Sequence, residues 1–91
     1  MQSIDLKVKK EITEGMEEKL SELDIDMLNT IEEFIASGLN ISEAAKRLFV
    51  HRNTLIYRLE KLAKDTGYDV RNFKEAVVFY VAFLLWKENR R

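Results

Sequence analysis

Nine side chains between residues 40 and 61 can each donate a hydrogen bond or a positive charge to an outside acceptor. They are Asn40, Ser42, His51, Arg52, Asn53, Thr54, Tyr57, Arg58 and Lys61. Arginine can make paired hydrogen bonds to guanine and asparagine can do so to adenine, while threonine offers a hydroxyl or a methyl group. Lysine, tyrosine and the free amides at a helix N-terminus suit phosphate oxygens. These residue types predict recognition of double-stranded DNA.

Two predicted helices joined by a tight turn would position these side chains. A short helix follows Asn40, and Ala44 and Ala45 give it a face of small residues. A longer helix is predicted over about 52–66, with Gly67 as its stop. Small side chains let two helices cross closely, so this order predicts a helix-turn-helix. In that arrangement the second helix places its N-terminus in the major groove.

The longer predicted helix has two different faces. Its buried stripe is expected to contain Leu55, Leu59, Leu62 and Ala63, with Ile56 at the edge. Four polar side chains share the opposite face: Thr54, Tyr57, Arg58 and Lys61. Three more stand at the leading tip: His51, Arg52 and Asn53. One face therefore anchors the helix and the other is free to contact DNA.

Helix caps predict the remaining elements. Asp24 can cap a helix that Gly38 ends. The segments 40–43 and 72–75 have the pattern of capping boxes, in which Asn40 or Asn72 caps the helix and a glutamate reaches back. The buried stripe of the helix after Asp24 is expected to be Met27, Leu28, Ile31, Phe34 and Ile35. The helix opened at residue 72 runs to about Glu88.

A leading helix is predicted from apolar residues at four-residue intervals: Ile4, Val8, Ile12, Met16 and Leu20. Gly15 can interrupt it. With no proline and only three glycines, the 91-residue chain is expected to be one all-α domain of about five helices. Residues 1–22 would form the leading helix and residues 24–91 the helix-turn-helix core.

The last predicted helix is apolar on every side over residues 76–86. A helix of this kind must be buried on more than one face, so part of it is expected to meet another subunit or domain. We expect a homodimer through the last or the first helix. The apolar run is shorter than the roughly 20 residues that span a bilayer, and no signal peptide is recognisable, so we expect a cytoplasmic protein without membrane contact.

Charge and composition narrow the function further. The net charge is −1, but residues 1–41 hold four lysines and ten acids, whereas residues 42–64 hold six basic and two acidic residues. The positive charge is therefore gathered in the segment that carries the nine polar side chains. The absence of cysteine and the single histidine, His51, argue against a metal centre. Without a phosphate-binding loop or nucleophile motif, neither a cofactor nor enzymatic activity is expected.

The string LFVHRNTLIYRLEKLAKDTGYDV resembles the C-terminal DNA-binding domain of PucR/CdaR-type bacterial transcriptional regulators, and the resemblance covers about residues 20–86. It implies sequence-specific double-stranded DNA binding in transcriptional regulation. It also implies a sensing domain upstream in a longer protein, so the chain is either a fragment or a stand-alone unit. A weaker similarity to the Fis-type helix-turn-helix matches Asn40 and Ser42 to backbone-contacting positions, and His51, Arg52 and Thr54 to positions near the bases. Phe49 stands where most such motifs have glycine.

The same residues also allow other interpretations. His51 either caps the second helix or contacts the groove, and Thr54 either caps the backbone or contacts DNA. Tyr57 is an alternative half-buried core aromatic, and Arg52 and Arg58 could pair with acidic residues. The alternative function is an α-helical protein-interaction or dimerisation module that uses the apolar last helix without binding DNA.

Overall fold

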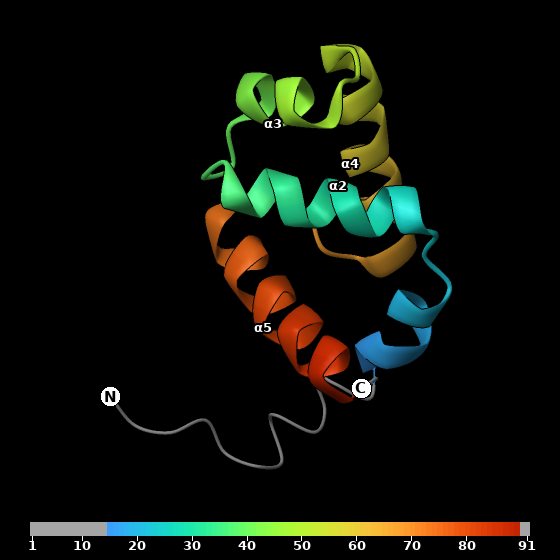
Figure 1. Ribbon diagram of the computed structural model, residues 1–91. Coiled ribbons are helices and arrows are strands. Elements are labelled where there is room, and N and C mark those ends of the chain that lie inside the picture. The colour runs from blue at the N-terminus through green and yellow to red at the C-terminus, as the bar shows by residue number, and fades with distance from the viewer. Residues whose placement is uncertain (1–14, 90–91) are drawn as a thin grey trace.

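The computed structural model describes residues 15–89, and all regular structure within them is helical (Figure 1). Residues 15–21 are helical, and four helices follow. These are α2 (Ile25–Ala36), α3 (Ile41–Leu48), α4 (Arg52–Thr66) and α5 (Phe73–Asn89). The predicted all-α class with five helices is confirmed. Most of the predicted leading helix, including Ile4, Val8 and Ile12, lies outside the described residues.

Helix α2 is the centre of the packing. It contacts both α3 and α4, which also contact each other, and α5 lies on the side of α2 away from α3 and runs obliquely to it (Figure 1). The Asp24 carboxylate accepts a hydrogen bond from the Met27 amide at 2.8 Å, as expected of an N-cap. Gly38 follows the helix with φ of 72°, the left-handed conformation that a glycine adopts without strain. Both predicted ends of α2 are therefore confirmed.

The core is built from one side of each helix. Its largest fully buried side chains include Phe34 on α2, Leu55, Leu59 and Leu62 on α4, and Phe79 and Phe83 on α5. Aromatic rings continue along α5, where Phe79, Phe83 and Trp86 follow each other with ring centroids 6.0–6.3 Å apart. The Trp86 indole donates to the Ser21 hydroxyl at 3.3 Å, which ties the helical residues 15–21 to the C-terminal half of α5.

In each of the two predicted capping boxes, only one of the two expected hydrogen bonds forms. Asn40 accepts from the Glu43 amide at 2.9 Å, and Asn72 accepts from the Glu75 amide at 3.2 Å. The reciprocal bonds are absent from both caps. The Asn40 amide donates to the Ser37 hydroxyl at 3.3 Å, and the Glu75 carboxylate accepts from the Asp69 amide at 3.1 Å. The preceding loops already supply acceptors for the two cap amides. The glutamate side chains therefore do not bond to these amides.

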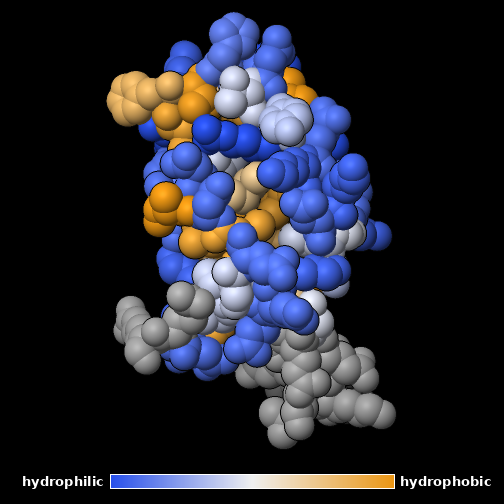
Figure 2. Space-filling model, turned by 90° about the vertical axis from the view of Figure 1, so that its right-hand side faces the viewer, coloured by the Kyte–Doolittle hydropathy of each residue, from blue (hydrophilic) through white to orange (hydrophobic). Residues whose placement is uncertain are grey.

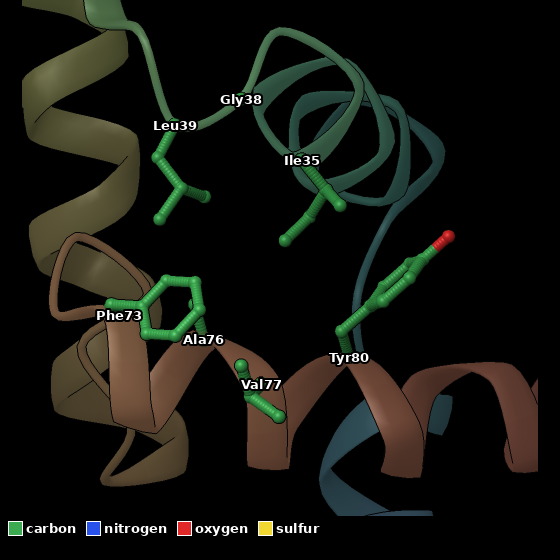
Figure 3. A pocket seen from close by; sticks show the side chains of 7 residues that line it. All are labelled: Ile35, Gly38, Leu39, Phe73, Ala76, Val77 and Tyr80. Atoms are coloured by element: carbon green, nitrogen blue, oxygen red, sulfur yellow. The ribbon is translucent and has the colours of Figure 1, made fainter.

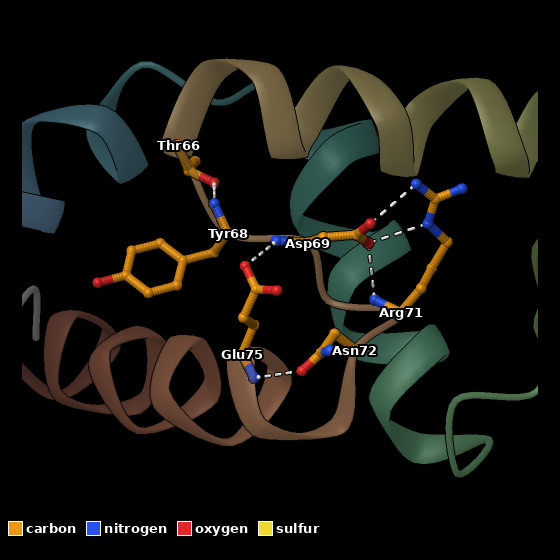
Figure 4. A network of polar contacts seen from close by, with 6 residues as sticks. All are labelled: Thr66, Tyr68, Asp69, Arg71, Asn72 and Glu75. Carbon is orange, nitrogen blue, oxygen red and sulfur yellow. Dashed lines mark hydrogen bonds and ion pairs between the residues drawn. The ribbon is translucent and has the colours of Figure 1, made fainter.

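The connection between α4 and α5 is held by a local network of polar contacts (Figure 4). The Thr66 hydroxyl donates to the Leu62 carbonyl at 2.7 Å and accepts from the Tyr68 amide at 3.2 Å. The Asp69 carboxylate accepts from the amide and the guanidinium of Arg71 at 2.9–3.0 Å. Gly67, which follows Thr66, has φ of 81°. The residues Thr66, Gly67 and Asp69 therefore shape the turn into α5.

Within residues 15–89, no helix combines the length and the apolar character needed to cross a bilayer.

A matched pair of substitutions on α2 tests the core. Ile31 is fully buried, whereas Ile25 on the same helix is 67% exposed. Ile31→Ala should lower the free energy of unfolding by about 2–5 kcal/mol, because it removes buried methyl groups and leaves a cavity. Ile25→Ala should change it by less than about 0.5 kcal/mol. Urea denaturation followed by circular dichroism measures both, and equal losses would contradict the packing described here.

The Asp69–Arg71 pair predicts a pH effect. Hydrogen bonds from Arg71 hold the pKa of the Asp69 carboxyl below its ordinary value. A lowered pKa means that the pair stabilises the fold fully above about pH 4 and loses this contribution as the pH falls through the folded-state pKa. Arg71→Ala should raise the Asp69 pKa in an NMR titration and start acid unfolding at a higher pH. Lys46→Ala is the control, and an unchanged Asp69 pKa in Arg71→Ala would contradict the assignment.

Candidate nucleic-acid interface

Helices α3 and α4 form the predicted helix-turn-helix. Ala44 and Ala45 are the buried residues of α3, so its backbone lies close to its neighbours. Helix α3 ends at Leu48. Its C-cap Phe49 adopts the left-handed conformation with φ of 57°, and the Val50 amide donates back to the Ala45 carbonyl at 3.1 Å. The left-handed C-cap and this hydrogen bond turn the chain sharply, and α4 begins at Arg52.

The tip of α4 presents four consecutive exposed side chains: His51, Arg52, Asn53 and Thr54. His51 is the N-cap, since its Nδ1 accepts from the Asn53 amide at 3.3 Å. A neutral imidazole that accepts at Nδ1 carries its proton on Nε2. The cap therefore leaves Nε2 as a hydrogen-bond donor for an outside acceptor, so capping and groove contact are compatible.

Helix α4 differs from α2, α3 and α5 in its first turn. An acidic residue occupies the first turn of α2 (Asp26), α3 (Glu43) and α5 (Glu75), whereas α4 has none there. Carboxylates in a first turn offset the partial positive charge of a helix N-terminus. At α4 that charge is left uncompensated and is reinforced by Arg52. The tip of α4 is therefore suited to an anion.

The outer face of α4 is polar and open to solvent. Tyr57 is 66% exposed, so the alternative of a half-buried core aromatic is wrong. Tyr57 and Lys61 line a shallow hollow together with Glu60, Lys64 and Asp65. Figure 2 shows the molecule from the side on which α4 lies in Figure 1, and hydrophilic residues dominate that surface. The inner stripe of Leu55, Leu59 and Leu62 is fully buried, as predicted.

Arg58 is placed differently from the other predicted contacts. It is half-buried, and its guanidinium donates to the Thr30 hydroxyl on α2 at 3.1 Å. Thr30 is itself fully buried and donates to the Asp26 carbonyl at 2.7 Å. Arg58 therefore helps to join α4 to α2. The sequence pattern placed it on the outer stripe, but Thr30 lies outside the apolar positions that predicted the buried face of α2.

Asn40 and Ser42 lie at the far end of α3, both exposed. An eight-residue helix is about 12 Å long, so this end of α3 is separated from the tip of α4 by roughly that length. Between them, Arg47 lies within 3.5 Å of Glu43 and 3.8 Å of Glu33 on α2, which occupies this cation with acidic partners. The helix-turn-helix thus exposes three polar regions: the N-terminus of α3, the tip of α4 and the outer face of α4.

A second feature is an apolar groove between α2 and α5 (Figure 3). It encloses about 230 Å³ and is lined by Ile35, Gly38, Leu39, Phe73, Ala76, Val77 and Tyr80. Phe73, Val77, Tyr80 and Leu84 recur on α5 at spacings of four, three and four residues. Phe73 is 73% exposed, and Val77 and Leu84 are nearly half exposed. The prediction that α5 is apolar on more than one face is consistent with this groove.

Comparisons with known proteins agree with this arrangement. The chain matches the PucR C-terminal helix-turn-helix domain over residues 27–85. The purine catabolism regulatory protein of Bacillus subtilis (strain 168) is 42% identical over 59 residues, which cover 65% of this chain and 11% of that protein. The carbohydrate diacid regulator of Escherichia coli (strain K12) is 48% identical over 44 residues, which cover 48% of this chain and 11% of that protein.

A solved structure is also similar. The crystal structure of a regulator of polyketide synthase expression from Bifidobacterium adolescentis matches with a TM-score of 0.82 and 28% identity. The match covers 93% of this chain and 36% of that one. The chain thus spans about a tenth of the two curated relatives described above and about a third of the crystallised regulator.

These features define a helix-turn-helix DNA-binding domain of the transcription-regulator class: the helical fold, the turn between α3 and α4, and the exposed tip of α4. More specifically, the chain belongs to the family of the PucR C-terminal helix-turn-helix domain.

Proposed function

We propose that this chain binds double-stranded DNA sequence-specifically in bacterial transcriptional regulation, with α4 as the recognition helix in the major groove. The observation that carries the proposal is the tip of α4, where His51, Arg52, Asn53 and Thr54 are exposed around an N-terminus without an acidic first turn. Major-groove base edges and phosphates supply the acceptors that such a tip can bind.

The proposed contacts divide by chemistry. Arg52 and Asn53 have the geometry for paired hydrogen bonds to base edges, and Thr54 can contact a thymine methyl or an acceptor. His51 Nε2, Tyr57 and Lys61 are assigned to phosphates on either side of the groove. Asn40 and Ser42 would contact a phosphate at the N-terminus of α3. Arg58 contributes indirectly, by fixing α4 on α2 through Thr30.

Residues 1–91 act as one DNA-binding domain, with residues 24–91 forming its core, and its role is binding without catalysis. Its place is the cytoplasm, where bacterial DNA lies. An upstream sensing domain, where the chain is joined to one, would control occupancy of the DNA site.

We also propose that two copies pair through α5. A single recognition helix reads few base pairs, whereas two copies spaced about 34 Å apart read two half-sites. Among the described residues, the helical segment 15–21 exposes mainly charged side chains such as Glu17, Glu18 and Lys19. The exposed apolar stripe of α5, by contrast, has the alternating spacing of four and three that two helices need to pack along each other. The last helix is thus favoured over the first as the interface.

The DNA-binding proposal predicts the effect of reversing charge on α4. Arg52→Glu combined with Lys61→Glu should lower the affinity for duplex DNA at least about tenfold at moderate salt, because two attractive interactions become repulsive. The slope of log K against log salt should also fall by about 0.9 for each phosphate that the variant no longer neutralises. Fluorescence anisotropy with a labelled duplex measures both quantities.

The matched control is Lys19→Glu. Lys19 is exposed on the helical segment 15–21, which lies at the opposite end of the molecule from α3 (Figure 1). This variant should bind DNA nearly as the unchanged protein does. An equal decrease in affinity in both variants would reduce the effect to net charge and contradict the assignment to α4.

The pairing proposal predicts the effect of a charge on α5. Val77→Glu should shift the protein from dimer to monomer in sedimentation equilibrium, because it buries an unpaired carboxylate between two apolar faces. The α4 double variant should keep the dimer. A dimer that survives Val77→Glu would place the interface elsewhere, and dissociation by Lys19→Glu would place it on the first helix.

A further inference from the structure

Phe49, at the turn of the helix-turn-helix, has an unusual combination of properties. Its side chain is 94% exposed, the largest value among the exposed large apolar residues of the described chain. Its backbone has φ of 57° and ψ of 40°, a left-handed conformation that carries a steric penalty for every residue with a Cβ. Glycine would adopt this conformation freely. Phe49 thus combines backbone strain with almost no burial.

Leu39 provides a comparison within the same chain. It is the other non-glycine residue among those described with positive φ, at 66°. Leu39 is half-buried and packs against the core, so burial offsets the strain of its backbone. No such compensation is available to Phe49 within the domain. The benefit of an aromatic ring at this position must therefore come from a contact outside the domain.

The surroundings of Phe49 indicate which partner supplies that contact. Phe49 is three residues from Arg52, so their Cα atoms are at most about 11 Å apart. Lys46 and Arg52 are exposed on either side of it, with no acidic residue between them. The segment around the ring is therefore basic, which favours a polyanion over an apolar or basic protein surface. A duplex seated on the tip of α4 would therefore lie close to Phe49, which precedes that tip by two residues along the chain.

We infer that Phe49 is an apolar DNA contact at the edge of the recognition surface, packing against a thymine methyl group or a deoxyribose. This inference rests on the proposed DNA-binding function and adds an apolar contact residue to it. Apolar contact with the thymine methyl is an established way of reading the major groove, and the ring would gain the burial that it lacks in the free domain. The contact involves no phosphate charge.

Three variants of Phe49 separate its role in binding from its role in folding. Phe49→Gly removes the ring and relieves the backbone strain, so its melting temperature should equal or exceed that of the unchanged protein. Phe49→Asn also removes the ring and tolerates the left-handed conformation, which covers the case that the glycine destabilises the turn. Phe49→Tyr keeps the ring and is the matched control.

The probe is a duplex selected by the unchanged protein from a randomised library. Removal of the ring in Phe49→Gly and Phe49→Asn should weaken binding about tenfold while leaving the slope against log salt unchanged, whereas Phe49→Tyr should bind normally. Replacing thymine by deoxyuridine in the probe separates the two apolar groups. A loss of affinity for the deoxyuridine probe that occurs in the unchanged protein and not in Phe49→Gly identifies the methyl group as the partner of Phe49, because a methyl contact made by Thr54 would be lost in both proteins. The same response of both proteins to the deoxyuridine probe, with Phe49→Gly still weakened on the thymine probe, identifies the sugar.

Two results would overturn the inference, and they differ in what else they affect. If Phe49→Gly and Phe49→Asn bind the selected duplex as tightly as the unchanged protein does, Phe49 makes no DNA contact, and only this inference fails. If the unchanged protein selects and binds no duplex, the proposed function fails together with the inference.

Discussion

The close approach of α3 to α2 and α4 is the constraint on which the rest of the molecule depends. Helix α3 has only eight residues, and Ala44 and Ala45 are its buried side chains. Because neither extends beyond a Cβ, the backbone of α3 can lie directly on its neighbours. A larger residue there would push α3 outward at a cost of about 1–3 kcal/mol. The direction of the following turn, and with it the position of the α4 tip, would change.

With this packing, the residues that hold α4 on α2 are different from the residues that are exposed at its tip and on its outer face. The buried leucines and the Arg58–Thr30 hydrogen bond hold the helix on α2, while the residues at its tip stay exposed to solvent. The chain can therefore carry a net charge of −1 and still present a basic surface, because most of its acidic residues precede α3. A polyanionic partner responds to the local electrostatic field at α4 rather than to the net charge of the whole chain.

Features determined by local sequence were predictable, and those set by contacts between elements were not. The ends of α4 at Arg52 and Gly67 and the asparagine caps follow from interactions within a few residues. The return bonds of the capping boxes failed because Ser37 and Asp69, in the preceding loops, compete for the same groups. Arg58 was expected on the free face because helical spacing cannot reveal a buried threonine on another helix. Likewise, the left-handed backbone of Phe49 follows from the wrap of α3 into α4, which residue type alone does not indicate.

The tip and outer face of α4, together with the N-terminus of α3, are the surface on which the proposed DNA binding depends. The most direct measurement is an NMR titration of the ¹⁵N-labelled protein with duplex DNA. We predict that the largest amide shift changes occur at residues 40–42 and 49–61, while amides along the groove between α2 and α5 change little. Changes concentrated on α5, or none at any DNA concentration, would contradict the assignment of this surface.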